Sequence, residues 1–493
     1  MSAAPEPPIH DADQIAQYER ARLSRDPRFD GRFFTGVLST GIYCRPICPA
    51  PAPKARNVVY FHSAAAAAAA GLRPCLRCRP EVAPDSAAWS GTEACVRRAL
   101  KLIRAGALND NSTEALAQRL GITDRHLRRL FARHLGAAPK VVATTQRLAF
   151  ARQLLRETRL PIGELALAAG FKSVRQFNTG FRRAFEMTPG DYRRAQAGPR
   201  AQAGLRLLLH YRPPYAWRQL LDFFTTRAIP GVESVDDDSY RRVIRVGTSL
   251  GTIAVSQVPG KHCLQLAIEG IDSALLTQVV NRVRLLFDLD ASPAAVAEVL
   301  AQDPLLAETV AAVPGLRLPG AWEPFELVVR AVLGQQVSVK AARTFAARIV
   351  ERCGQPLAAD AASDVGLTHA FPTPSQLAQA DLNGLGITGR RIRTLQQIGA
   401  AMAAGDLQLE RGMDLATCLA QLQALPGIGP WTAHYIAMRG LSEPDAFPEG
   451  DLGLLKALQR VEPQAGVREL SQRAEAWRPW RAYAVMYLWQ TLA

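Results

Sequence analysis

Hydrophobic and polar residues follow two different periods along the 493-residue chain. Between residues 243 and 270, the segments VIRV, GTIAVSQV and HCLQLAIEG place apolar side chains at every second position, with Leu264, Leu266 and Ile268 on one face. This alternation predicts half-buried β-strands. Residues 90–195 and nearly all of residues 286–493 instead show the spacing of amphipathic helices. The pattern therefore predicts a multidomain, mainly α protein that also contains a small α+β sheet domain.

Two stretches rich in small residues and proline interrupt this pattern. One lies at residues 82–91, and the other, AQAGPRAQAG at Ala195–Gly204, has the composition of a flexible linker. A chain of this length can hold three or four domains, each with its own core. We expect four domains, at residues 1–82, 90–195, 205–285 and 286–493.

The positive charge of the chain is concentrated in its N-terminal part. The formal net charge is +15, and residues 1–200 hold 32 Lys and Arg against 16 Asp and Glu, whereas the remainder is close to neutral. This excess indicates a polyanionic partner, most simply double-stranded DNA. The N-terminus lacks the basic and apolar regions of a secretion signal, and no apolar run reaches the length of a membrane span. We therefore expect a cytoplasmic protein with no membrane partner, in which clustered cysteines indicate metal binding or catalysis.

Four of the eight cysteines form two closely spaced pairs. Cys44 and Cys48 are separated from Cys75 and Cys78 by 26 residues. Each short pair can bind a metal from one loop while the intervening chain closes the site, which is the pattern of a tetrahedral zinc site with four thiolates. The sequence predicts one zinc ion held by these four cysteines, within a small domain of α+β type. It predicts no iron–sulfur cluster, because Cys353 and Cys418 have no neighbouring cysteines.

The segments around these cysteines, FDGRFFTGVLSTGIYCRPIC and AAGLRPCLRCRPE, closely resemble the N-terminal domain of Ada-type adaptive-response proteins. The resemblance implies that Cys44 accepts a methyl group from methyl phosphotriesters in DNA, and that Arg45 lies beside the DNA phosphate. Methylation of one thiolate would remove one negative charge from the site, so attraction to DNA should rise. A purely structural zinc site remains the alternative.

Residues 90–195 contain two candidate helix-turn-helix units, with turn glycines at Gly121 and Gly170. In the first unit, STEALAQRLGITDRHLRRLFARHLG predicts a basic recognition helix over Asp124–His134, and in the second, Ser173 is the expected N-cap of a helix that ends at Phe185. The segment GFRRAFEMTPGDYRR resembles the AraC/XylS family of transcription activators, which implies promoter DNA and RNA polymerase as partners. The candidate DNA-binding residues are Arg125, Arg128, Arg129, Arg175 and Gln176, and the aromatic residues predicted to be core are Phe181, Phe185 and Tyr192.

A glycine-opened turn in LPGIGPWTAHYIAMRGLSEPDAFPEGD, residues 425–451, directly precedes a predicted helix. Such a turn leaves backbone N–H groups at a helix N-terminus free to bind a phosphate oxygen. The spacing resembles the helix-hairpin-helix motif of DNA base-excision glycosylases, which implies that Gly427 and Gly429 contact the DNA backbone and that Asp451 is catalytic. From the residues alone, Asp445 and Glu449 are rivals, and Asp451 could also be an ordinary N-cap.

LRLLLHYRPPYAWRQLLDFFTTRAIPGVE, FELVVRAVLGQQVSVKAARTFAARIVE and WRPWRAYAVMYLWQTLA resemble AlkA-type 3-methyladenine DNA glycosylases in the same order. The resemblance implies two helical subdomains and excision of a flipped-out alkylated base. Trp431 stands where bifunctional relatives have a lysine, which implies a monofunctional glycosylase. Gln336 stands where the AlkA pattern has a bulky apolar wedge. The candidate substrate-binding residues are Trp431, Tyr435, Trp489 and Gln335.

The sequence therefore predicts an alkylated-DNA repair enzyme fused to a methyl-accepting zinc domain and a transcription activator module. The alternative is a transcription regulator that binds damaged DNA through a catalytically inactive glycosylase domain. Cys263, in the middle of a predicted strand, is expected to be a small core residue.

Overall fold

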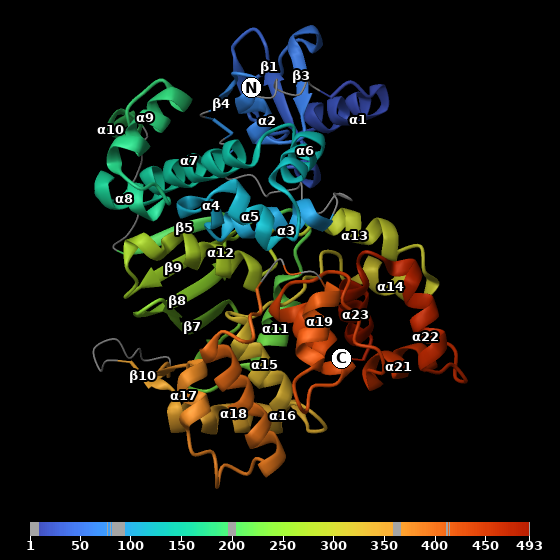
Figure 1. The fold of residues 1–493 in the computed structure, drawn as a ribbon. Coiled ribbons are helices and arrows are strands. Elements are labelled where there is room, and N and C mark those ends of the chain that lie inside the picture. The colour runs from blue at the N-terminus through green and yellow to red at the C-terminus, as the bar shows by residue number, and fades with distance from the viewer. Residues whose placement is uncertain are drawn as a thin grey trace.

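The computed structural model describes residues 9–492 except 76, 79, 81–93, 196–203, 358–365, 411–412 and 414. The two expected linkers, residues 82–91 and the greater part of Ala195–Gly204, lie outside the described residues. The cysteine-rich module lies at one end of the molecule, and the helix-turn-helix units lie between it and most of the sheet domain and the C-terminal helices (Figure 1). None of the described helices is long and apolar enough to cross a membrane.

The cysteine-rich module is built on a four-stranded sheet with strand order β3-β1-β2-β4. β1 pairs antiparallel with β2 and β3, whereas β4 runs parallel to β2. Ser63 caps helix α2 by accepting a hydrogen bond from the N–H of Ala66 at 3.0 Å. The elements are α1 (Ala12–Leu23), η1 (Pro27–Phe29), β1 (Phe34–Val37), β2 (Ile42–Cys44), η2 (Ala55–Asn57), β3 (Val58–Phe61), α2 (Ala64–Ala69) and β4 (Arg73–Pro74).

The described part of residues 90–195 is entirely helical outside its turns. Gly121 and Gly170 have φ angles of 72° and 81°, in the left-handed region that a tight turn between two helices favours for glycine. The side chain of Ser173 caps α9 as predicted, by accepting the N–H of Gln176 at 3.2 Å. The helices are α3 (Ala94–Arg104), α4 (Ala107–Asp110), α5 (Thr113–Arg119), α6 (Asp124–Leu135), α7 (Pro139–Glu157), α8 (Ile162–Ala168), α9 (Val174–Phe185) and α10 (Pro189–Ala195).

The predicted alternating strands are confirmed in a five-stranded antiparallel sheet of order β5-β9-β8-β7-β6. Leu264, Leu266 and Ile268 of β9 are buried on one face, and Cys263 is fully buried as expected. The elements are β5 (Leu205–His210), α11 (Trp217–Arg227), β6 (Glu233–Val235), β7 (Ser239–Val246), β8 (Ser249–Gln257), β9 (Cys263–Glu269), η4 (Ser273–Leu275) and α12 (Leu276–Leu286).

The C-terminal helices form two groups. The helices α15–α20 pack on one another, with α16, α17 and α18 below the sheet, while α13 and α14 pack with α21–α23 to one side (Figure 1). The elements are α13 (Pro293–Leu300), α14 (Pro304–Ala312), α15 (Pro324–Leu333), α16 (Val339–Cys353), β10 (Gln355–Pro356), β11 (His369–Ala370), α17 (Pro374–Gln379), α18 (Gly389–Ala404), α19 (Leu415–Gln423), α20 (Pro430–Gly440), α21 (Leu452–Gln459), α22 (Val467–Ala474), η5 (Glu475–Trp477) and α23 (Arg481–Gln490).

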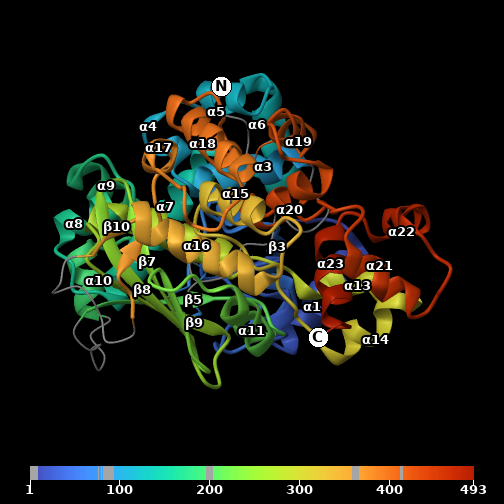
Figure 2. The same cartoon turned by 90° about the horizontal axis from the view of Figure 1, so that it is seen from below.

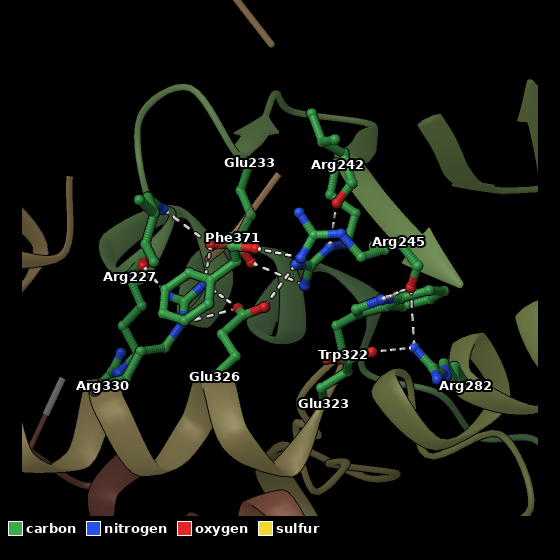
Figure 3. Close-up of polar contacts among 12 residues, drawn as sticks. Arg227, Glu233, Arg242, Arg245, Arg282, Trp322, Glu323, Glu326, Arg330 and Phe371 are labelled. Carbon is green, nitrogen blue, oxygen red and sulfur yellow. Dashed lines mark hydrogen bonds and ion pairs between the residues drawn. The ribbon is translucent and has the colours of Figure 1, made fainter. Parts of the chain in front are cut away.

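A buried ion-pair network fixes the sheet domain to α15 (Figure 3). Glu326 of α15 accepts hydrogen bonds from Arg242 of β7 at 2.7 Å and from Arg330 at 2.6 Å. Arg330 also pairs with Glu233 of β6. Burial alone would raise the pKa of Glu233, but Arg330 and Arg242 outweigh it and lower that pKa to about 2. Because removing one partner would leave a buried charge uncompensated, the network holds the sheet in one position on the helices.

Asp288 is a buried carboxyl for which we expect removal of the charge to stabilise the protein. Burial raises its pKa to about 6, against the opposing charge of Arg317. Because the pKa of Asp288 is higher in the folded protein than in the unfolded chain, the folded protein binds this proton more tightly. The resulting stability is present at low pH and is lost as the pH rises through the folded pKa. Tyr483 and the N–H of Leu318 both donate to the same oxygen, so an asparagine can accept both bonds. The backbone at Asp288 has a φ of 49°, a left-handed conformation that asparagine also tolerates.

We therefore expect Asp288→Asn to stabilise the protein by about 2 kcal/mol near pH 7.5, and to have little effect below about pH 4, as measured by unfolding at several pH values. Asp290 is the matched control. Although burial opposes it, Arg284 and Arg104 hold the pKa of Asp290 below its usual value. Asp290→Asn should therefore destabilise the protein at neutral pH. Equal effects of the two substitutions at neutral pH would contradict this assignment.

Candidate active site, zinc centre and DNA-binding surfaces

Asp451 is held by four N–H donors. Its Oδ1 accepts hydrogen bonds from the backbone N–H groups of Gly453 at 2.9 Å and Leu454 at 3.0 Å, which makes Asp451 the N-cap of α21. The indole N–H of Trp489 donates to Oδ1 at 3.1 Å, and that of Trp431 donates to Oδ2 at 2.9 Å. Donors on both oxygens fix the orientation of the carboxylate.

The three candidate aromatic residues lie together around this carboxylate. Trp431 and Tyr435 are stacked, with ring centroids 5.3 Å apart and planes 9° apart. Tyr435 and Trp489 are 6.4 Å apart and inclined by 49°. All three side chains are partly exposed, so aromatic surface next to Asp451 is accessible from solvent. Trp431 and Tyr435 are four residues apart on α20 and therefore share one helix face.

A pair of arginines behind Tyr435 was not expected from the sequence. Arg439 donates to the Tyr435 hydroxyl at 2.7 Å, and its guanidinium carbon lies 5.5 Å from the centre of the Tyr435 ring. Burial alone would raise the pKa of Tyr435, but the charges of Arg439 and Arg227 outweigh it and keep that pKa below its usual value. The only sequence signal was the spacing of Arg439, four residues after Tyr435 on one helix.

The two rival carboxylates have different surroundings. Asp445 accepts hydrogen bonds from Arg481 at 2.8 and 3.1 Å and also pairs with Arg478. Glu449 is exposed. Asp451 is thus the only one of the three whose carboxylate is placed against the candidate aromatic residues.

The hairpin between α19 and α20 is tied to the turn between α15 and α16. The Gln335 amide donates to the carbonyl of Gly427 at 2.8 Å and to the Thr432 hydroxyl at 3.1 Å. Gly427 has a φ of 88°, whereas Gly429 has a φ of −90° and is the exposed N-cap of α20. Gln335 therefore holds the hairpin in place, in addition to its candidate role near the substrate.

The two hairpin glycines offer a matched test. A Cβ at Gly427 would lie 2.7 Å from the hydroxyl oxygen of Thr394 and would require a left-handed backbone, whereas a Cβ at Gly429 would meet nothing within 4 Å. We expect Gly427→Ala to destabilise the hairpin by about 1–2 kcal/mol and to weaken DNA binding. Gly429→Ala should leave the unfolding temperature unchanged. Thermal unfolding and DNA-binding titrations of both variants check this, and a greater loss of stability in the Gly429 variant would be inconsistent with the geometry.

Gln336, at the expected wedge position, is exposed and has a φ of 53°. A residue other than glycine in this region carries a conformational cost of about 1 kcal/mol, and such strain is concentrated at functional sites. The backbone therefore presents the Gln336 side chain to solvent, next to the contact between Gln335 and the hairpin.

The four paired cysteines come together as predicted. Their Sγ atoms lie within 4.8 Å of one another, and those of Cys48 and Cys75 are 4.0 Å apart. A tetrahedral zinc ion with Zn–S bonds of 2.3 Å requires sulfur atoms about 3.8 Å apart, so the donor set fits zinc. Cys75 and Cys78 are each 6% exposed, whereas Cys44 and Cys48 are partly exposed. Cys44 and Cys48 are therefore the accessible pair.

The position of Arg45 differs from the expected phosphate contact. Arg45 is only 5% exposed, and its guanidinium forms a bidentate ion pair with Asp30 and donates to the carbonyl of Cys78 at 3.1 Å. Its backbone N–H donates to the Cys78 Sγ at 3.2 Å. A buried guanidinium with these partners is not available to a DNA phosphate. The side chain instead supports the loop that carries Cys78.

Arginines from the other modules also hold this region. Arg152 of α7 donates to the carbonyl of Cys75 at 3.1 Å, and Arg212, just after β5, donates to the carbonyl of Asp30 at 2.9 Å. Both arginines are fully buried. The sequence did not reveal these contacts because the partners are separated by 77 and 182 residues.

The two helices predicted to contact DNA are present as α6 and α9, and all five candidate DNA-binding side chains on them are exposed. Arg128 donates to Asp124 at 2.7 Å, and Arg129 lies 2.9 Å from a ring nitrogen of His126. The side-chain oxygen of Gln176 accepts the N–H of Lys172 at 3.2 Å. The three aromatic residues predicted to be core are buried, namely Phe181, Phe185 and Tyr192.

These modules correspond to four families, which define a fusion of a metal-binding domain, a helix-turn-helix domain and a base-excision glycosylase. The families and the residues matched are "Metal binding domain of Ada", 17–81, "Helix-turn-helix domain", 116–195, "AlkA N-terminal domain", 206–323, and "HhH-GPD superfamily base excision DNA repair protein", 329–481. The resemblances and the fold class expected from the sequence are thereby confirmed.

Relatives of the whole chain have the same organisation. The chain is 42% identical over 486 residues to the "Probable bifunctional transcriptional activator/DNA repair enzyme AlkA" of Mycobacterium tuberculosis, with 97% of each chain covered, and it belongs to this family. It is 34% identical to "DNA-3-methyladenine glycosylase 2" of Escherichia coli over 57% of this chain and 96% of that protein. The 3-methyladenine DNA-glycosylase of Archaeoglobus fulgidus shares the fold, with a TM-score of 0.50 and 21% identity over 57% of this chain and 96% of that one.

Proposed function

We propose that this protein is a monofunctional DNA-3-methyladenine glycosylase of the type II class that also senses methyl phosphotriesters and activates transcription. The observation that carries the glycosylase assignment is the Asp451 carboxylate, oriented by the indole N–H groups of Trp431 and Trp489. We assign residues 1–82 to the methyl-accepting domain, 90–195 to promoter binding, 205–285 to the sheet domain and 286–493 to the glycosylase. The partners are double-stranded, alkylated and promoter DNA, with RNA polymerase as the partner in activation, in the cytoplasm.

Base release begins with a flipped-out alkylated base. An N3- or N7-alkylated purine is cationic, so the aromatic faces of Trp431, Tyr435 and Trp489 attract it through cation–π contacts of about 0.5–2 kcal/mol. When the N-glycosidic bond breaks, its electron pair neutralises the departing base, and positive charge develops on the sugar. No strong general acid is required.

Asp451 acts on the sugar. Its negative charge stabilises the oxocarbenium-like sugar and orients the water whose oxygen bonds to C1′. That water gives up one proton to the Asp451 carboxylate, which passes it to solvent, and the product is an abasic site. The side chain at the position of the bifunctional lysine is Trp431, which has no amine to form a Schiff base. The four N–H donors hold the Asp451 carboxylate in a fixed orientation while charge develops on the sugar, so little reorganisation is needed.

The zinc domain performs a second, stoichiometric reaction. Cys44, Cys48, Cys75 and Cys78 would hold one zinc ion, which would supply the charge that keeps their sulfurs deprotonated and nucleophilic. The Sγ of Cys44 attacks the methyl carbon of a methyl phosphotriester, the C–O bond breaks, and its electron pair returns to the phosphate oxygen. The accessibility of Cys44 supports this role, whereas Cys78 is buried and already accepts an N–H.

The test is release of free 3-methyladenine and 7-methylguanine from methylated duplex DNA by the full-length protein. We expect release by the wild type and no strand cleavage at the abasic site. Binding of methylated DNA without release would instead establish the alternative, a regulator with an inactive glycosylase domain. Strand cleavage without added base would contradict the monofunctional assignment.

A further inference from the structure

Helix α3 presents one basic face to the glycosylase module. Arg97, Lys101 and Arg104 are spaced by four and three residues, so they lie on one side of the helix. Arg97 donates to Glu443 at 3.2 Å, and Arg104 donates to Asp290 at 2.9 Å. α3 lies between the residues matched by the metal-binding family and those matched by the helix-turn-helix family.

Lys101 binds the C-terminal end of the active-site helix α20. Its Nζ donates to the carbonyl of Ser442 at 2.9 Å and to that of Leu441 at 3.3 Å, and Lys101 is only 9% exposed. Leu441 is the C-cap of α20. The last carbonyls of a helix lack partners within the helix and carry partial negative charge, so a buried ammonium group stabilises this end of the helix.

The end of α20 bears directly on the candidate active site. α20 carries Trp431 and Tyr435, and the ten residues that follow it lead to Asp451. Ser442, within that connection, has a φ of 54°, so its backbone depends on the surrounding contacts. Lys101 and Arg97 thus hold the start of the segment that ends at the catalytic carboxylate.

Helix α3 also belongs to the helix-turn-helix module. α3 packs on α6, the first recognition helix, and on α7 (Figure 2). Val96, Leu100 and Ile103 of α3 are buried in the same core cluster as Leu127 and Phe131 of α6. The position of Lys101 is therefore fixed by the packing of the helix-turn-helix module.

We propose that Lys101 is a positioning residue for base excision, by which the transcription activator module completes the glycosylase site. The proposal rests on the glycosylase function proposed above. The Lys101 ammonium group holds the C-terminal end of α20 and the start of the segment that leads to Asp451. The carboxylate and the aromatic side chains then keep the relative position that cleavage of the glycosidic bond requires.

The experiment measures the single-turnover rate of 3-methyladenine release and the affinity for duplex DNA containing an abasic site, using full-length protein. Lys101→Met keeps the apolar stem and removes the ammonium group. We expect the rate to fall about 10-fold while affinity changes less than about 2-fold. Lys101→Arg should restore the rate to within about 3-fold of wild type. Arg119→Met is the matched control, because it removes an exposed contact with Glu410 that does not involve α20.

The outcomes separate this proposal from the glycosylase assignment. A Lys101→Met protein with the wild-type rate, beside an inactive Asp451→Asn, overturns the role of Lys101 and leaves the glycosylase intact. No release by wild type overturns the glycosylase assignment itself. If Lys101→Met does not fold, Arg97→Met replaces it, with Glu443→Gln added to remove the unpaired carboxylate. If Arg97→Met releases base slowly and Glu443→Gln restores the rate, the result supports the proposal that α3 holds the C-terminal end of α20. A folded Arg97→Met with the wild-type rate contradicts it.

Discussion

Replacing Asp451 with asparagine is expected to reduce release of 3-methyladenine by on the order of 1000-fold. The substitution removes the negative charge that opposes the positive charge developing on the sugar. It also disturbs the hydrogen bonds, since an amide has one acceptor oxygen where the carboxylate has two. Oδ1 serves the helix cap and Trp489, and Oδ2 serves Trp431, so in the variant one of these N–H groups must face an amide N–H.

The measurement is the single-turnover release of base, with thermal unfolding recorded on the same protein. Glu449→Gln is the matched control, because Glu449 is an exposed carboxylate two residues away. We expect the control to retain the wild-type rate. Asp445→Asn is less suitable, since it would also break the ion pairs that Asp445 forms with Arg478 and Arg481 and leave Glu475 as their remaining partner. A folded Asp451→Asn that retains more than about a tenth of the wild-type rate would remove Asp451 from the mechanism.

Asp451 shows how far sequence reasoning reaches at this site. An aspartate directly before an apolar-periodic helix predicts an N-cap, and the resemblance implied catalysis at the same residue. The structure confirms the N-cap. Capping occupies Oδ1, while Oδ2 receives only the indole N–H of Trp431 among the hydrogen bonds that the described residues make to it. The two roles therefore do not compete for the same oxygen, which the sequence could not reveal.

The helices and strands were predicted well because the residues that determine them are neighbours in the sequence. Ser173 caps α9 through a residue three positions away, and the alternation in β9 reflects burial of one face of a sheet. Arg45 was misplaced for the opposite reason. The resemblance to Ada-type domains implied a phosphate contact for Arg45, but its partner Asp30 is brought to it by the fold of the small sheet. The basic face of α3 likewise resembles a solvated or DNA-binding face until its acceptors in the glycosylase are known.

Replacing Cys44 with alanine is expected to abolish methyl uptake from methylated DNA while the fold is retained. Wild-type protein should gain the mass of one CH₂ group on the peptide containing Cys44, measured by intact-mass and peptide mass spectrometry. In the variant, Cys48, Cys75 and Cys78 would remain as donors that could hold a zinc ion. Cys75→Ala should be more harmful to folding, because Cys75 is buried and its carbonyl is held by Arg152 of another module.

Cys353→Ala is the matched control for this experiment, because Cys353 is partly exposed and lies outside the four-cysteine cluster. This control should accept a methyl group as the wild type does. Methylated wild-type protein should also bind DNA more tightly than the unmethylated form, with the difference shrinking as salt is added, since the site has lost one negative charge. Equal loss of folding in Cys44→Ala and Cys75→Ala, with no methyl group on wild-type Cys44, would show that the zinc site is purely structural. A methyl group on Cys48 instead would assign the transfer to the other accessible thiolate.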